Sequence, residues 1–363
     1  MPVRVLVVDD TAFYRRAVSE ALAGIPGVEV AGTAANGSIA LSRIESLQPD
    51  LLTLDVEMPG ITGLEVLESI AGSARRPGAI MLSSHTPRGG RMTVRALELG
   101  AFDFIAKPEG AGASMNLVAL REQLASIIRA FERHRQVRTL LTPEAKRVRP
   151  IAAVAPAPPP LASRRRPSRG SPVVLIGVST GGPAALATLL PTLPADLGAP
   201  VLIVQHMPPM FTQPLAESLA RKCLLPVKEA EDGETAGSNC VYIAPGGRHM
   251  KIEAGPAGAL LLRLTDDPPE HSCRPAVDCL FRSAALQAPG RAVAVILTGM
   301  GQDGTAGLRL LKRSGCHSIA QDEASCVVFG MPREAIHAGL VDSVEPLDRI
   351  ARAIVRYVRE DRA

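Results

Sequence analysis

Three polar residues in the second half of the chain have the side-chain types that nucleophilic catalysis requires. Ser179 lies in the glycine-flanked stretch GVSTGG, His206 follows the apolar run VLIVQ, and Asp303 lies in TGMGQDG directly after AVAVIL. Because the carboxyl ends of parallel strands meet at one edge of a sheet, we expect the three to converge. As a triad, Ser179 would attack an acyl carbon, His206 would carry the proton, and Asp303 would orient the imidazole.

Other interpretations of these residues are available. The glycines could cradle a phosphate, but residues 177 to 182 contain neither G-x-x-x-x-G-K-[ST] nor G-x-G-x-x-G. Taken singly, such a serine is most often a helix cap, the histidine a structural donor, and the aspartate a turn former. Their coincidence at three strand ends favours the triad. We expect the backbone amides of Thr180 and Met300, near a helix that starts at Gly182, to bind the oxyanion.

A second group of polar residues lies at strand ends in the first half of the chain. It comprises Asp9, Asp10, Asp55, Ser83 and Lys107. Three carboxylates held close together repel one another unless a cation lies among them, and oxygen ligands of this kind suit Mg²⁺. With that metal, Asp55 could attack the phosphorus of a phosphodonor while Lys107 and Ser83 hold the transferred oxygens.

The segments that carry these residues alternate regularly between strand and helix patterns. In the first half, apolar runs at 3–8, 28–34, 51–56, 79–83 and 102–106 alternate with amphipathic stretches at 12–23, 37–47, 63–71, 90–99 and 114–137. This pattern predicts a five-stranded, doubly wound parallel α/β sheet. The second half predicts another α/β module with a mostly parallel sheet, and some hairpin character between Cys240 and Leu264. Its expected strands are 173–178, 201–206, 241–246, 260–264, 292–298 and 318–321, and its expected helices are 182–190, 211–222, 275–286 and 305–314.

Composition limits the other classes of function. Residues 148 to 172 are rich in Pro, Ala and Arg without apolar periodicity, which indicates an extended tether; its arginines could instead form a docking patch for an anionic partner. A net charge of +4, from 40 Lys and Arg against 36 Asp and Glu, requires no nucleic-acid partner. No run approaches the ~20 apolar residues of a membrane span. We expect a cytoplasmic protein that is not inserted into a membrane. The six cysteines form no C-x-x-C pair and are expected to be small buried residues.

The strand-end motifs DD, LDVEMPG, LSS and Lys-Pro of the first half together resemble the receiver domain of bacterial response regulators. The resemblance implies that Asp55 is phosphorylated, that Asp9 and Asp10 help to bind Mg²⁺ with Asp55, and that Ser83 is the switch hydroxyl. It also implies that Lys107 is the lysine that follows the fifth strand, with a cis bond to Pro108. Whether Phe104 is the aromatic residue of the switch stays open.

The motifs IGVSTGGP, VQHMP, YIAPGGRHM, RPAVDCLFRSAA and LTGMGQDG resemble, in this order, the catalytic domain of the chemotaxis protein-glutamate methylesterases. That family removes methyl groups from glutamate side chains of chemoreceptors, releases methanol, and often deamidates glutamines. The resemblance implies a receiver domain over 1–137, a linker over 138–171 and a methylesterase domain over 172–363, with Ser179, His206 and Asp303 catalytic and no cofactor in the esterase. The implied partners are a histidine kinase of the chemotaxis type and methylated chemoreceptors.

The sequence also leaves alternatives open. A phosphorylation-gated protein that binds a receptor without chemistry is the main alternative, and a transcriptional regulator is weaker because no compact three-helix reader is present. His249 and Arg274 could line the substrate cleft, but packing is at least as good an explanation. His271, Cys273 and Cys279 lack the spacing of a metal site.

We expect the unphosphorylated receiver to block access to Ser179 and phosphorylation of Asp55 to relieve that block.

Overall fold

The computed structural model describes residues 2–73, 76–107, 116–141 and 171–360. The chain divides into two compact units, Met1–Val137 and Arg138–Ala363, and each is described by itself. Within the described ranges, none of the helices combines the length and the apolar character that a transmembrane span needs. The predicted cis bond at Pro108 and most of the predicted linker lie outside the described residues.

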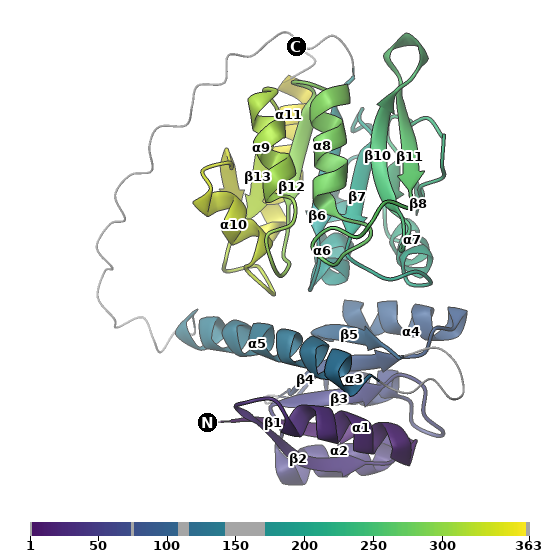
Figure 1. Ribbon diagram of the computed structural model, residues 1–363, viewed down its shortest axis with the longest axis vertical. Coiled ribbons are helices and arrows are strands. Elements are labelled where there is room, and N and C mark those ends of the chain that lie inside the picture. The colour runs from purple at the N-terminus through teal and green to yellow at the C-terminus, as the bar shows by residue number, and fades with distance from the viewer. Residues whose placement is uncertain (1, 74–75, 108–115, 142–170, 361–363) are drawn as a thin grey trace. The chain divides into compact units, whose positions relative to one another are not determined.

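The first unit is a five-stranded parallel sheet in the order β2-β1-β3-β4-β5 (Figure 1). Its strands are β1 (Val3–Val8), β2 (Val28–Ala34), β3 (Leu51–Asp55), β4 (Gly78–Ser83) and β5 (Asp103–Ala106). Its helices are α1 (Ala12–Ala23), α2 (Gly37–Leu47), α3 (Gly63–Ile70), α4 (Pro87–Glu98) and α5 (Leu117–Leu141). The doubly wound receiver fold is therefore confirmed. Helix α5 runs past residue 137, into the segment that we predict to be linker.

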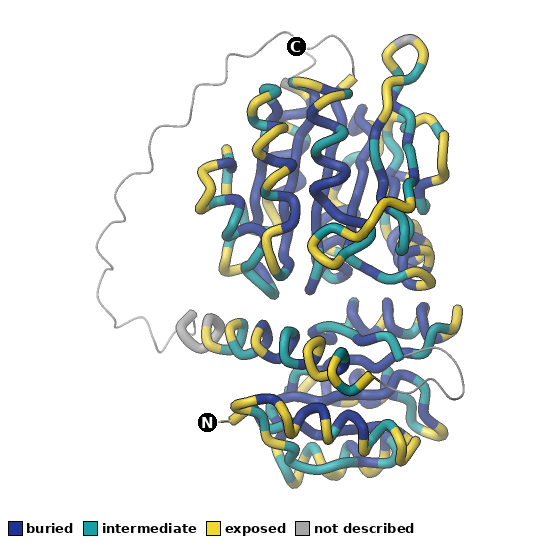
Figure 2. Tube along the Cα trace, in the orientation of Figure 1, coloured by how far each residue is buried: buried dark blue, intermediate teal, exposed yellow. Residues whose placement is uncertain are grey.

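Local sequence explains how these helices begin. Thr62 and Glu65 form a reciprocal capping box at the start of α3, and Asn36 accepts the backbone N–H of Ile39 at the start of α2. The central strands β1 and β3 are almost continuously buried, as a parallel sheet covered on both faces requires, and Figure 2 shows the burial along them. The strand ends that carry the acidic residues are thereby fixed on a rigid core.

The second unit has a seven-stranded parallel sheet in the order β14-β13-β12-β6-β7-β9-β8 and a separate antiparallel pair, β10-β11. Its strands are β6 (Val173–Val178), β7 (Val201–Gln205), β8 (Val227–Glu229), β9 (Val241–Ile243), β10 (His249–Ala254), β11 (Leu260–Thr265), β12 (Ala292–Ile296), β13 (His317–Gln321) and β14 (Ser343–Glu345). Its α-helices are α6 (Gly182–Leu189), α7 (Thr212–Ala220), α8 (Val277–Gln287), α9 (Thr305–Arg313), α10 (Met331–His337) and α11 (Leu347–Glu360), and short 3₁₀ turns lie at Leu190–Thr192 and Pro256–Gly258. The mostly parallel sheet and the hairpin are both as predicted.

Five elements of the structure are absent from the predicted set, although one of them, β10, forms the first strand of the predicted hairpin. Strands β8 and β14 have only three residues each, too few for a periodic pattern to stand out. The short helix α10 starts beside a proline. Helix α11 is different, because its buried residues Ile350, Ile354 and Val358 recur at helical spacing. This apolar spacing is visible in the sequence and is typical of an amphipathic helix.

Candidate active site

Ser179, His206 and Asp303 follow three neighbouring strands of the second sheet. The sheet order places β12, β6 and β7 side by side, and all three run parallel. Val178 pairs with Gln205 in the register of β6 and β7, so Ser179 and His206 occupy the next positions on adjacent strands. The backbone N–H of His206 donates to the carbonyl of Val178 at 3.0 Å. Ser179 and His206 therefore lie at the same edge of this sheet.

His206 and Asp303 are joined directly by a hydrogen bond. His206 Nε2 lies 2.7 Å from Asp303 Oδ2, and the two side chains are only 10% and 1% exposed. Burial disfavours the charged imidazolium, but the hydrogen bond with Asp303, together with an interaction with Cys273, outweighs it and raises the pKa of His206 to about 9. Since Nε2 is committed to Asp303, Nδ1 is the ring nitrogen left for the proton of a serine. The imidazole of His206 therefore has a high affinity for a proton.

Asp303 is held by backbone amides of two helices. Its Oδ2 accepts the N–H of Val277 at 2.7 Å, and its Oδ1 accepts the N–H groups of Asp278 at 2.9 Å and Gly304 at 2.8 Å. These donors lie at the starts of α8 and α9, where the helix dipoles favour a negative charge. Burial alone would raise the pKa of Asp303, but His206 and these amides lower it. The carboxylate is therefore kept ionised beside the imidazole.

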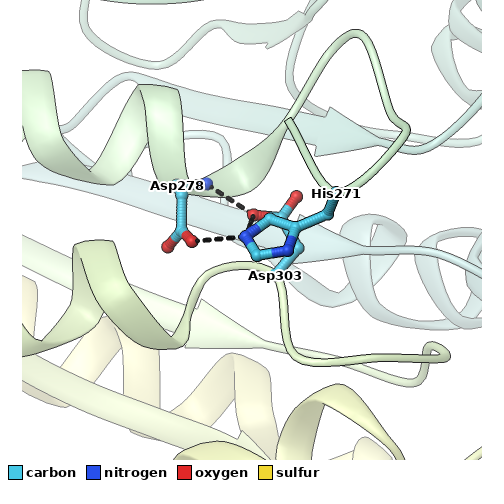
Figure 3. A group of neighbouring side chains, drawn as sticks. All are labelled: His271, Asp278 and Asp303. Atoms are coloured by element: carbon cyan, nitrogen blue, oxygen red, sulfur yellow. Dashed lines mark hydrogen bonds and ion pairs between the residues drawn. The ribbon is translucent and has the colours of Figure 1, made fainter. Parts of the chain in front are cut away.

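His271, Asp278 and Asp303 form a compact group beside this pair, seen in Figure 3. His271 Nε2 lies 3.0 Å from Asp278 Oδ2 and 3.9 Å from Asp303 Oδ1. Their ligand atoms lie within 4.8 Å of one another, which is compatible with a metal ion. However, each oxygen of Asp303 already accepts two N–H donors, counting His206. We therefore interpret the group as a hydrogen-bonded cluster that orients Asp303.

Asp278 contributes to that orientation from α8. Its Oδ1 accepts the N–H of Gly307, in the first turn of α9, at 2.6 Å. Asp303 precedes α9 and binds amides of α8, so the two aspartates each bind the start of the other's helix. A Cβ on Gly307 would lie 2.5 Å from Phe281 Cβ, so glycine is needed for the two helices to approach this closely. Burial, with Asp303 nearby, raises the pKa of Asp278.

Close packing fixes the backbone around Ser179. Its N–H donates to the carbonyl of Thr298 at 3.0 Å. A Cβ added to Gly299 would lie 2.8 Å from Ser179 Cβ and 2.4 Å from Met331 Sδ, so the loop after β12 approaches the serine without room for a side chain. Among the described residues, no hydrogen bond joins the Ser179 hydroxyl to His206. Such contacts are often long without substrate and tighten in the reacting complex.

Sequence reasoning did not find three of the residues that contact this site. Gln205 donates from its side chain to the carbonyls of Ser179 and His206, Cys273 helps to raise the pKa of His206, and Asp278 supports Asp303. Two of them lie in motifs already quoted, VQHMP and RPAVDCLF, and Cys273 directly precedes the second. Only tertiary contacts reveal their roles.

All six cysteines are free, but three are only partly buried, so the expectation of buried cysteines is correct for Cys279, Cys316 and Cys326 alone.

The two cleft candidates have structural contacts. His249 is fully buried; its Nδ1 accepts the N–H of Ala276 at 3.1 Å and its Nε2 lies 3.1 Å from the carbonyl of Pro268. Arg274 donates to the carbonyls of Asp266 and Asp267 at 3.1 and 3.2 Å. Both residues therefore secure loops, in line with the packing interpretation.

The first unit gathers its predicted residues at the carboxyl edge of its sheet. Lys107 Nζ lies 2.8 Å from Asp9 Oδ2 and 2.9 Å from Asp55 Oδ2. Burial raises the pKa of Asp55 to about 6 even though Lys107 opposes the rise. Burial disfavours the charge on Lys107, but Asp55 and Asp9 outweigh it and raise the pKa of the lysine. Lys107 also lies over the ring of Tyr14, 4.5 Å from its centroid.

The acidic residues fit a hard divalent cation. Ligand oxygens of Asp9, Asp10 and Asp55 lie within 4.8 Å of one another; Asp10 is exposed, so water can complete a shell. Ser83 is fully buried, accepts from Thr93 Oγ1 at 2.7 Å and lies 3.3 Å from the carbonyl of Ser84. Its hydroxyl is therefore turned toward α4 here.

Comparison with known proteins assigns the family. The model of the CheB methylesterase family matches residues 174–354, and the response regulator receiver domain model matches residues 5–119. The "Protein-glutamate methylesterase/protein-glutamine glutaminase" of Desulfotalea psychrophila is 51% identical over 98% of both chains. This chain belongs to the CheB methylesterase family.

Further relatives agree with that assignment. The protein of the same name from Bacillus subtilis is 44% identical over 99% of both chains. The crystal structure of the Thermotoga maritima CheB methylesterase catalytic domain superposes with a TM-score of 0.51 and 43% identity, covering 52% of this chain and 99% of that one. The two family models match the two halves in which the sequence placed a receiver and a methylesterase.

Proposed function

We propose that this chain is a phosphorylation-activated protein-glutamate methylesterase that also deamidates protein glutamines. The observation that carries the proposal is the buried His206–Asp303 hydrogen bond of 2.7 Å, at the edge of the sheet where Ser179 follows the neighbouring strand. A histidine held by a buried carboxylate next to a serine is the arrangement that acyl transfer requires. The names of the relatives supply the substrate class, because nothing in a triad alone selects a methyl ester.

In the proposed reaction, Ser179 Oγ attacks the carbonyl carbon of the glutamate methyl ester while His206 Nδ1 accepts the hydroxyl proton. The tetrahedral oxyanion is stabilised by backbone amides, for which Thr180 and Met300 are the proposed donors. Collapse breaks the bond to the methoxy oxygen, which leaves as methanol with the proton from His206. Water then attacks the acyl-enzyme by the same route and releases the glutamate carboxyl group. A glutamine substrate would lose ammonia instead.

The receiver unit is proposed to accept a phosphoryl group on Asp55. Mg²⁺ held by Asp9, Asp10 and Asp55 would offset negative charge at phosphorus when bound. Lys107 lies against Asp9 and Asp55 and is placed to bind a transferred oxygen. Ser83 would turn from Thr93 toward the phosphoryl group, and that movement would alter the surface next to α4.

Gating would follow from tethering the two units on one chain. A linker keeps the local concentration of the receiver high, so even a weak contact can cover the active-site edge. Phosphorylation of Asp55 would weaken that contact and uncover Ser179. The proposed boundaries are a receiver over 1–137, a linker over 138–171 and a catalytic domain over 172–363. The proposed partners are a chemotaxis-type histidine kinase and methylated chemoreceptors, and the proposed location is the cytoplasm.

The proposed function is tested by methanol release from methylated receptor membranes, with and without a small phosphodonor. Ser179→Ala should remove essentially all release while the protein stays folded, because Ser179 is the proposed nucleophile. Full release by that variant would leave only the alternative, a gated receptor-binding protein whose preparation contains another esterase. A chain of residues 170–363 should be active without a phosphodonor. Equal basal rates in this truncated chain and in the unphosphorylated full chain would contradict the gating.

A further inference from the structure

Gln205 is the last residue of β7 and lies between the nucleophile and the base. Its side chain is buried, with 2% of its surface exposed. The side-chain amide Nε2 donates to the carbonyl of Ser179 at 3.0 Å and to the carbonyl of His206 at 3.1 Å. One NH₂ group therefore uses both of its hydrogens to join the backbones of two residues of the triad.

The surroundings of Gln205 allow only this orientation of the amide. Its Oε1 is buried and accepts no hydrogen bond from the described residues. Turning the amide over would place this oxygen against two carbonyl oxygens, which would repel it. A Cβ on Gly182 would lie only 1.9 Å from Oε1, so the first residue of α6 packs directly on the amide. The donor group is locked in place by packing.

Holding these two carbonyls also fixes the N–H groups of the next residues in the chain. The Ser179 carbonyl accepts from Gln205 and from the N–H of Gly182, at 2.8 Å. In a trans peptide the C=O and the next N–H point in opposite directions, so fixing this carbonyl fixes the direction of the Thr180 N–H. That amide is one of the two proposed oxyanion donors. The carbonyl of His206 fixes the start of the loop after β7 in the same way.

We propose that Gln205 is a positioning residue of the esterase, which pre-orients the peptide after Ser179 for the transition state and holds the backbone of His206. This inference depends on the proposed function and adds to it a residue that does not touch substrate. Because Gln205 is uncharged and its hydrogen bonds go to backbone carbonyls, its loss should act on the stabilisation of the oxyanion rather than on the protonation of the imidazole.

The test compares Gln205→Met and Gln205→Glu with the wild-type full chain under a phosphodonor, measured as methanol release from methylated receptor membranes. Methionine keeps the volume but removes both donors, and we expect kcat to fall about 10- to 100-fold, since losing one oxyanion donor outright costs about 10²- to 10³-fold. KM should stay within about twofold, and the pH midpoint of kcat/KM should not move. Glutamate keeps the shape but points an oxygen at two carbonyls, so its loss should be larger than that of methionine.

The control is Ser318→Ala. Ser318 is also a fully buried polar residue in a strand of the same sheet, and its hydroxyl donates to the carbonyl of Leu340 and contacts Asp342 rather than Ser179 or His206. It should lower the melting temperature while kcat changes less than about threefold. A Gln205→Met protein with wild-type kcat, or one whose loss matches that of Ser318→Ala, would overturn the proposal. If methionine prevents folding, the kcat and KM of Gln205→Glu decide instead. Wild-type protein that releases no methanol would instead refute the proposed function.

Discussion

Replacing Asp303 by asparagine should change both the rate of the esterase and its dependence on pH. In the native protein, the pKa of His206 is about 9 against an ordinary 6.5. At pH 7 only about one imidazole in a hundred would then be neutral and able to accept the proton of Ser179. We expect kcat/KM of the native esterase to rise with pH up to about 9.

Without the carboxylate, burial disfavours the imidazolium and the pKa of His206 should fall from about 9, although Cys273 still opposes that fall. Loss of the orienting carboxylate from a Ser-His-Asp triad costs about 10⁴-fold in kcat. At pH 7 this cost is partly offset, because a larger share of the variant's imidazole is neutral. The deficit of Asp303→Asn should therefore be about 10⁴-fold above pH 9 and smaller at pH 7, by up to about 10²-fold.

The assay is methanol release by the activated full chain from pH 5.5 to 10, with Ser179→Ala as the blank. A deficit that does not vary with pH, or the same inflection in both proteins, would refute the assignment of Asp303 as the partner of the base. Asparagine also offers only one acceptor oxygen where the carboxylate accepts Val277, Asp278 and Gly304. Some loss of stability is thus expected and should be measured alongside.

The same pair makes a stability prediction whose sign can be worked out. A folded pKa raised from 6.5 to about 9 corresponds to roughly 3 kcal/mol, present in full below pH 6.5 and lost as the pH rises through 9. The lowered pKa of Asp303 contributes only above its ordinary 3.8 and is lost on acidification. Denaturant unfolding of the isolated 170–363 chain should show native protein exceeding Asp303→Asn most between about pH 4 and 6.5.

Three further changes test other parts of the structure. Gly299→Ala should abolish most methanol release and lower the melting temperature, because its Cβ would lie 2.8 Å from Ser179 Cβ and 2.4 Å from Met331 Sδ; normal activity would contradict this packing. Asp55→Asn, or chelation of Mg²⁺, should prevent labelling by a radioactive phosphodonor while the 170–363 chain keeps its esterase rate, and any labelling of the variant would identify another acceptor. Phe281→Ala should destabilise the catalytic unit by about 3–5 kcal/mol in urea, since Phe281 is fully buried; a change below 1 kcal/mol would show that the core adapts.

The sequence predicted the fold well where elements are long and buried. Parallel strands such as β6 and β12 are unbroken apolar runs. Ser179 follows β6 directly and Asp303 lies in the loop after β12, so both could be expected at one edge from the sequence alone. The three-residue strands β8 and β14 could not be found this way, because pairing with a neighbour defines them rather than any pattern of their own. For α11 the apolar spacing in the sequence is typical of a helix, although this helix was not among those predicted.

For the proposed site, the sequence indicated candidate reacting groups but not the residues that support them. Sequence spacing at strand ends identifies side chains that reach a shared edge, but it does not say which buried amide or carboxylate holds them. In the sequence, Gln205 is one more polar residue at a strand end. Asp278 is an acidic residue in the first turn of a helix, where the helix dipole alone accounts for a negative charge. Their partners are the backbone groups of Ser179, His206 and Gly307, and contacts of this kind are visible only in three dimensions.

These supports explain how a raised histidine pKa is compatible with catalysis. Asp303 cannot relax away from His206, because amides of Val277, Asp278 and Gly304 hold both of its oxygens. In the proposed mechanism, the imidazolium that forms during the reaction is therefore strongly stabilised, at the cost of a smaller neutral fraction beforehand. Stabilising charge that develops in the transition state is where an enzyme gains rate, so a site of this kind should be most effective in mildly alkaline solution. An esterase optimum below pH 7 would show that the His206–Asp303 pair is weaker in the working enzyme than its 2.7 Å separation implies.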